Sequence, residues 1–232
     1  MPARSASARI QEASFLVVES GRVRFFVRPR VDIEVPRSID DVQRFVFTLA
    51  PRNQGQVRRL SIGKKRMPDD RLRERHWTYV DRVGSAAEVV SDLGPRRYTT
   101  KTHGLRHQAG LIEVASGTYA ITLHRDHAHL MYELAQENDA MGPSDLLRQL
   151  GLAVRASYIA VVFNPESKWA ARDREEERTP FSEPIDDGLK DKFDHRRYVP
   201  LDPFYLEHQG TELVLIGGGQ SEDFSHASRT RS

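Results

Sequence analysis

The chain has 232 residues, of which 38% are hydrophobic and 29% charged, with a formal net charge of +2 and no cysteine. The lack of cysteine excludes disulfide bonds, thiolate metal sites, iron–sulfur clusters and a cysteine nucleophile. The apolar runs are far shorter than the roughly 20 residues that cross a bilayer, and no apolar segment of signal-peptide length follows the basic residues 1–9. We therefore expect a soluble, cytoplasmic protein that makes no contact with membranes.

The first half of the chain predicts strands separated by polar turns. Residues 14–31 predict a hairpin whose turn, at residues 19–22, uses Gly21 to reach a positive φ. Ser38 is a candidate cap for a short helical turn. The other predicted elements of this half are strands at 43–49, 60–62 and 77–83 and a helix at 86–93.

The second half predicts elements of the same kinds. Residues 117–124 and 129–134 alternate between polar and apolar side chains, which predicts two strands of one hairpin. Residues 144–150 predict a short helix, and the apolar, β-branched residues 156–163 predict a buried strand. A last hairpin is expected from strands at 204–206 and 212–216.

Together these elements predict an α+β fold, mainly an antiparallel sheet with two or three short helices. A loose parallel between the halves leaves open a single domain or two similar lobes. The expected parts are a disordered tail (1–13), a basic strand-rich lobe (14–110), a second lobe (111–216) with an acidic loop (164–195), and a disordered tail (217–232).

The small net charge hides an uneven distribution. Residues 1–116 carry a net charge of +9 and residues 117–232 a net charge of −7. Such asymmetry is typical of a basic region that binds nucleic acid or another acidic partner. Two alternatives remain: the halves neutralise each other within one fold, or the protein has a structural role and self-associates through its oppositely charged halves.

Arginines recur at alternate positions between residues 22 and 30, around one aromatic residue. In an extended strand such residues share a face, and neighbours on that face lie about 6.6 Å apart. Guanidinium groups could then contact successive phosphates while the aromatic ring stacks on a base. The predicted binding residues are Arg22, Arg24, Phe26, Arg28, Arg30, Arg58, Arg59, Lys64, Lys65 and Arg66.

This pattern predicts a non-catalytic binding protein without a cofactor. Its partner would be nucleic acid first and an acidic protein surface second, recognised by charge with limited sequence readout. The alternative for the arginines is ion pairing with nearby carboxylates such as Asp32 and Glu34.

Histidines gather in the middle of the chain. His127 and His129 would share a face of a strand, and His124 or His107 could supply a third metal ligand. Asp126 could bind the metal or orient an imidazole. The alternative function is therefore a hydrolase that depends on a divalent metal, unless these are ordinary surface histidines at a hairpin tip. Convergence of three imidazoles would favour the enzyme, and dispersal would favour the arginine face.

Overall fold

The computed structural model describes residues 15–69, 71–135, 144–167, 189 and 191–218. Its strands are β1 (Leu16–Pro29), β2 (Val42–Pro51), β3 (Val57–Ile62), β4 (Arg75–Gly84), β5 (Arg96–Thr100), β6 (Gly104–Gln108), β7 (Ile112–Leu123), β8 (Ala128–Leu134), β9 (Arg155–Phe163), β10 (Tyr198–Pro200) and β11 (Glu212–Gly217). Its helices are α1 (Glu88–Ser91), α2 (Ser144–Gln149) and the 3-10 helices η1 (Ile39–Asp41), η2 (Asp191–Phe193) and η3 (Pro203–Glu207). Within these residues no helix combines the length and the hydropathy needed to cross a membrane.

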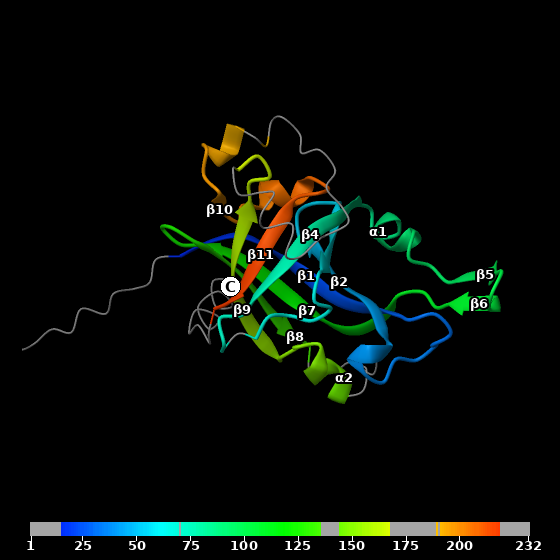
Figure 1. The fold of residues 1–232 in the computed structure, drawn as a ribbon. Helices are drawn as coiled ribbons and strands as arrows, with labels where there is room; N and C mark the ends of the chain where they lie inside the picture. Colours follow the sequence, from blue (N-terminus) through cyan, green and yellow to red (C-terminus); the bar gives the residue numbers. More distant parts are fainter. Residues whose placement is uncertain (1–14, 70, 136–143, 168–188, 190, 219–232) are drawn as a thin grey trace, which may run out of the picture.

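Eight strands form a closed antiparallel barrel (Figure 1). Their order around the ring is β1-β2-β3-β4-β11-β9-β8-β7, and β7 pairs with β1 to complete it. Strand β10 pairs antiparallel with the last residues of β9. Strands β5 and β6 form a separate two-stranded hairpin that projects from the barrel (Figure 1).

The prediction of an α+β fold with a lobed sheet is therefore wrong. The α-helices are short, and strands from both halves of the chain pair in one ring. Local periodicity shows where strands lie but not that β9 pairs with both β8 and β11, and those long-range pairings close the barrel. The predicted tail at 1–13, most of the acidic loop at 164–195 and most of the tail at 217–232 lie outside the described residues.

The barrel interior is filled with apolar and aromatic side chains. Val23, Phe25 and Val27 alternate along β1 and are at most 1% exposed. The Phe25 ring lies 5.7 Å from that of Phe47 in β2 and 5.0 Å from that of Tyr132 in β8 (centroid distances), which joins strands across the interior. Such packing agrees with the width of an eight-stranded barrel, which is just large enough for side chains to fill.

A buried ion pair also crosses the interior. Nη1 of Arg58 in β3 lies 2.7 Å from both carboxylate oxygens of Glu19 in β1, and the Tyr119 hydroxyl donates to Glu19 at 2.7 Å. The Arg58 side chain is fully buried. Burial, with the nearby Glu19 charge, raises the pKa of Tyr119, so the hydroxyl remains protonated and can donate. Three strands are thereby linked through one carboxylate.

Several local predictions are confirmed. The helical turn after Ser38 is η1, which leads directly into β2. The hairpin predicted at 117–134 is formed by β7 and β8, and the predicted helix and buried strand that follow are α2 and β9.

Two predicted hairpins are wrong. Strand β1 runs without a turn from Leu16 to Pro29, and Gly21 lies within it, outside the positive-φ region. A Cβ at Gly21 would lie only 2.0 Å from the Ala50 carbonyl oxygen, so this glycine permits the close approach of β1 and β2. Residues 204–206 belong to helix η3, and β11 pairs instead with β4 and β9.

The tight contact at Gly21 predicts that Gly21→Ala destabilises the barrel. The added methyl overlaps a backbone carbonyl and forces the strands apart, which we expect to cost about 1–3 kcal/mol. Urea unfolding measures the loss. Gly55→Ala is the matched control, because a Cβ there meets nothing within 4 Å. Equal midpoints for the two variants would contradict this account of Gly21.

Candidate anion-binding site and histidine cluster

The arginine stripe of β1 lies on the outer face of the barrel, as its alternation predicted for Arg22, Arg24, Phe26 and Arg28. Arg30 follows the end of the strand and is exposed. Arg22 is also exposed, whereas Arg28 is only 9% exposed. The stripe is therefore not a uniform cationic surface.

The middle of the stripe is largely neutralised. The Arg24 guanidinium donates to Glu113, and this hydrogen bond raises the pKa of Arg24. The same guanidinium lies 5.3 Å from the centre of the Phe26 ring. Phe26 is only 7% exposed, so the base stacking expected at this residue is not available in this structure.

Arg58 and Arg59 are buried, so their prediction as surface binding residues is wrong. Arg58 lies inside the barrel with Glu19. Arg59 lies outside the barrel wall but is covered by α1, where its guanidinium binds Asp81 at 2.9 Å and Asp92 at 2.7 Å. Buried charges need such partners, and the sequence does not distinguish a buried arginine from an exposed one.

The basic residues 64–66 follow β3. Lys64 is exposed, Lys65 donates its ammonium group to the Val42 carbonyl at 3.0 Å, and Arg66 pairs with Glu74 at 2.5 Å. Because Val42 pairs with Pro29, this turn lies at the end of the barrel where β1 ends.

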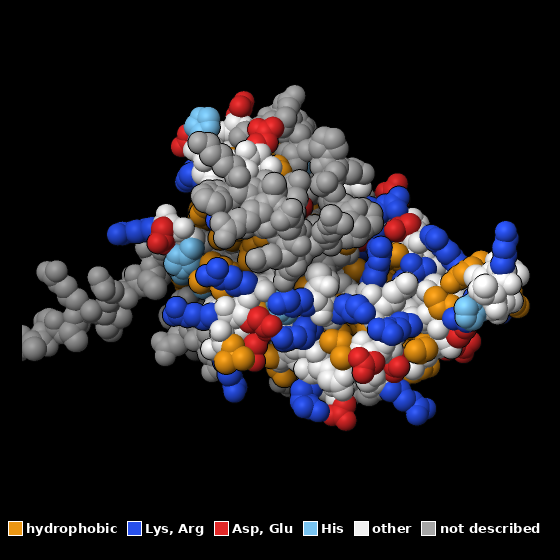
Figure 2. Space-filling model, viewed as in Figure 1, with side chains coloured by type: hydrophobic (Ala, Val, Ile, Leu, Met, Phe, Trp, Pro, Cys, Tyr) orange, Lys and Arg blue, Asp and Glu red, His pale blue; other side chains and the backbone are white. Residues whose placement is uncertain are grey.

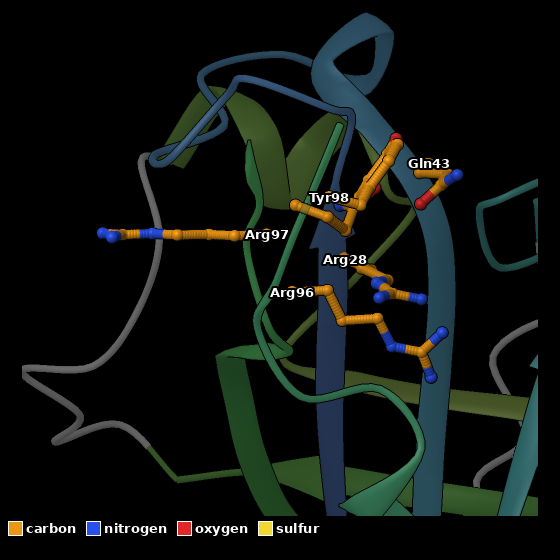
Figure 3. A pocket seen from close by; sticks show the side chains of 6 residues that line it. Arg28, Gln43, Arg96, Arg97 and Tyr98 are labelled. Atoms are coloured by element: carbon orange, nitrogen blue, oxygen red, sulfur yellow. The ribbon is translucent and has the colours of Figure 1, made fainter. Parts of the chain in front are cut away.

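A pocket of about 500 Å³ lies on the outer face near Arg28. It is lined by Arg28, Gln43, Arg96, Arg97, Tyr98 and Gln108. The guanidinium groups of Arg28 and Arg96 point to the same side of it, and Arg97 extends the opposite way (Figure 3). The pocket thus joins the end of β1 to the base of the β5–β6 hairpin.

Arg28 is held in an unfavourable environment for a cation. Burial lowers the pKa of Arg28, the positive charges of Arg96 and Arg44 lower it further, and the negative charge of Asp92 opposes them. Arg44 is its direct cross-strand neighbour, an arrangement of like charges that destabilises a sheet. The buried Nε of Arg28 has no hydrogen-bond partner among the described residues. An anion in the pocket would compensate the positive charge of Arg28 and accept a hydrogen bond from its Nε.

The β5–β6 hairpin extends the cationic surface. Residues 93–112 contain no Asp or Glu, and their basic residues are Arg96, Arg97, Lys101, His103, Arg106 and His107. Asp32 and Glu34 lie against two of these, at 2.9 Å from Arg106 and 3.8 Å from His107. Tyr98 is 43% exposed. Figure 2 shows basic side chains on the projecting hairpin and on the face that leads to it. The predicted binding set left this hairpin out, although its run without acidic residues was a visible signal.

Asp92 fixes the base of this surface. Its carboxylate accepts hydrogen bonds from Arg59 and lies 3.2 Å from Arg82, and its carbonyl accepts one from Arg96 at 2.6 Å. The hydrogen bond from Arg59 is the main reason that the pKa of Asp92 falls to about 2. The carboxylate therefore stays ionised at neutral pH and positions the arginines around it.

The histidines converge. One ring nitrogen each of His124, His127 and His129 lies within 4.8 Å of the other two. The rings of His124 and His127 are stacked, with centroids 4.7 Å apart. The exposed carboxylate of Asp126 lies 2.7 Å from Nδ1 of His127, and this hydrogen bond lowers the pKa of Asp126. His107 lies in β6 and is not part of the cluster.

The low pKa of Asp92 predicts that the free energy of unfolding decreases at acidic pH. Its folded pKa lies below the usual value of 3.8, so its stabilisation is present above pH 4 and is lost as the pH falls towards 2. Asp92→Asn should lose on the order of 1–2 kcal/mol at pH 6, after allowance for screening of a side chain 36% exposed. Urea unfolding at pH 6 and pH 3 should show that the difference in unfolding free energy between the wild type and Asp92→Asn is smaller at pH 3. Asp145→Asn, at an exposed ion pair, is the control, and an equal loss in both variants would contradict the role of Asp92.

No family model matches this chain, and neither a curated protein nor a solved structure matches it.

Proposed function

We propose that this protein binds an acidic partner, single-stranded nucleic acid in the first place. The second candidate is a metal-dependent hydrolase, which the convergence of His124, His127 and His129 favours. The pocket of Arg28 and Arg96 is the centre of the proposed site. The observation that carries the proposal is Arg28, a residue only 9% exposed whose Nε has no partner among the described residues. Burying a charge in this way is costly unless another group compensates it.

A phosphodiester has the chemistry that the pocket needs. Its oxygens carry negative charge and accept hydrogen bonds, and arginine donates to phosphate in a bidentate manner. Two guanidinium groups on one side of a pocket of about 500 Å³ leave space for one phosphate with its sugar. The nearby Lys64 and the hairpin cations would attract the rest of the polymer.

Tyr98 supplies the aromatic contact that the sequence predicts at Phe26. It lines the same pocket and is 43% exposed, so its ring is accessible to a base. Stacking on an aromatic side chain beside a cationic groove is a common way to bind single strands without sequence preference. Duplex DNA offers phosphates but no accessible base faces, which makes single strands the better fit.

Arg28→Ala and Arg96→Ala should each weaken binding of a labelled single-stranded oligonucleotide. Each lost phosphate contact should reduce the slope of log K against log salt by about 0.7. Tyr98→Ala should instead weaken binding by about 1–3 kcal/mol with little change of slope, because stacking releases no counterion. Fluorescence anisotropy over a range of salt concentrations measures both quantities.

Arg52→Ala is the matched control, since Arg52 is an exposed arginine beyond the opposite end of β2. It should retain nearly all of the affinity. Absence of binding by the wild-type protein at low salt would refute the nucleic-acid proposal. Equal effects of Arg28→Ala and Arg52→Ala would refute the site. Binding of poly-glutamate in place of oligonucleotide would identify an acidic protein surface as the partner.

A further inference from the structure

We propose that His124, His127 and His129 form a zinc-binding site where β7 turns into β8. The inference is independent of the proposed nucleic-acid site. Strand β1 has its Leu16 end beside Leu123 and its Pro29 end at the arginine pocket, so the sites lie at opposite ends of one strand. Along β1 they are about 40 Å apart at 3.3 Å per residue.

The turn itself brings the three rings together. The His124 amide donates to the His127 carbonyl at 2.8 Å, which places these two residues opposite each other. Ala128 then points into the core, and alternation directs His129 to the outer face of the barrel. Residues 124–129 therefore bring the three imidazoles together through one backbone hydrogen bond and the alternation of side chains at the start of β8.

Two of the rings are oriented by neighbouring polar groups. Nδ1 of His127 bonds to Asp126, and Nδ1 of His129 bonds to the Ser157 hydroxyl of β9 at 2.8 Å. Histidines that bind metals commonly use one nitrogen for such an orienting contact and the other for the metal. These contacts orient both rings and leave Nε2 of His127 for a metal ion.

The environment of His124 points to a ligand. Its Nε2 is buried and has no hydrogen-bond partner among the described residues. The same is true of the Thr122 hydroxyl, which is paired in register with His129. Buried polar atoms are seldom left unsatisfied. Phe15 packs against His124, with ring centroids 5.8 Å apart, and limits the access of solvent. A metal ion would satisfy Nε2 of His124 directly.

Zinc is the metal whose coordination fits this set. Imidazole nitrogens bind Zn²⁺ at about 2.0–2.1 Å in tetrahedral geometry, which sets ligand nitrogens about 3.3 Å apart. The nitrogens here lie within 4.8 Å of one another, so small side-chain rotations bring them into range. Three protein ligands leave a fourth position for water or a bound anion, as in catalytic zinc sites.

The test uses the full chain without a histidine tag, treated with a chelator and then titrated with Zn²⁺ by calorimetry. We expect one ion per chain, a higher melting temperature with zinc, and at least tenfold weaker binding in His127→Ala. Asp126→Ala should weaken binding about 10- to 100-fold through loss of the orienting contact. His127 lies in the turn and is partly exposed, so its replacement should leave the fold intact, which circular dichroism checks.

His103→Ala is the matched control, because His103 is an exposed histidine in the β5–β6 turn. Its zinc affinity should equal that of the wild type. The proposal is overturned if the wild type binds no zinc, or if the His103 and His127 variants bind it equally. Cobalt provides a second readout: a Co²⁺ spectrum without tetrahedral bands in the wild type would also overturn it.

Discussion

The hydrogen bonds between β8 and β9 close the barrel, and both candidate sites depend on that closure. Once the ring is complete, its interior is filled by side chains, so functional groups lie on the outer face and at the ends. The same pairing brings Ser157 of β9 beside His129 of β8, which orients that ring. Strand β1, paired on both sides, provides the frame that separates the histidine cluster from the arginine pocket.

Closure of the barrel also explains why two arginines, Arg58 and Arg59, are buried and form ion pairs within the fold. Arg58 points into the barrel interior, where it donates to the Glu19 carboxylate, and Tyr119 donates to the same carboxylate. Arg59 on the opposite face of β3 holds α1 to the barrel through Asp92. A pair of adjacent arginines thus serves two different layers of the structure, because adjacent residues of a strand face opposite sides.

Local features of the fold were predictable from the sequence, and long-range features were not. Alternation correctly identified the outward face of β1 and the β7–β8 hairpin, because side-chain direction depends only on neighbouring residues. Gly21 was misinterpreted, since a glycine needed for close strand contact has the same sequence signal as one in a turn. The His127–His129 pair was predictable from spacing, whereas the proximity of Arg28 and Arg96 required the hairpin to lie beside the end of β1.

The structure shows how part of the positive charge of residues 1–116 is paired in the folded barrel. Buried Arg58 and Arg59 pair with Glu19, Asp81 and Asp92 of the same basic half, and Arg58 also lies 3.5 Å from Glu207 of the acidic half. They also use carboxylates that could otherwise have neutralised the surface. The segment from position 93 to 112 has no acidic residue, although its Arg106 pairs with Asp32 at 2.9 Å. The exposed cations among the described residues are the ones that the proposed acidic partner would contact.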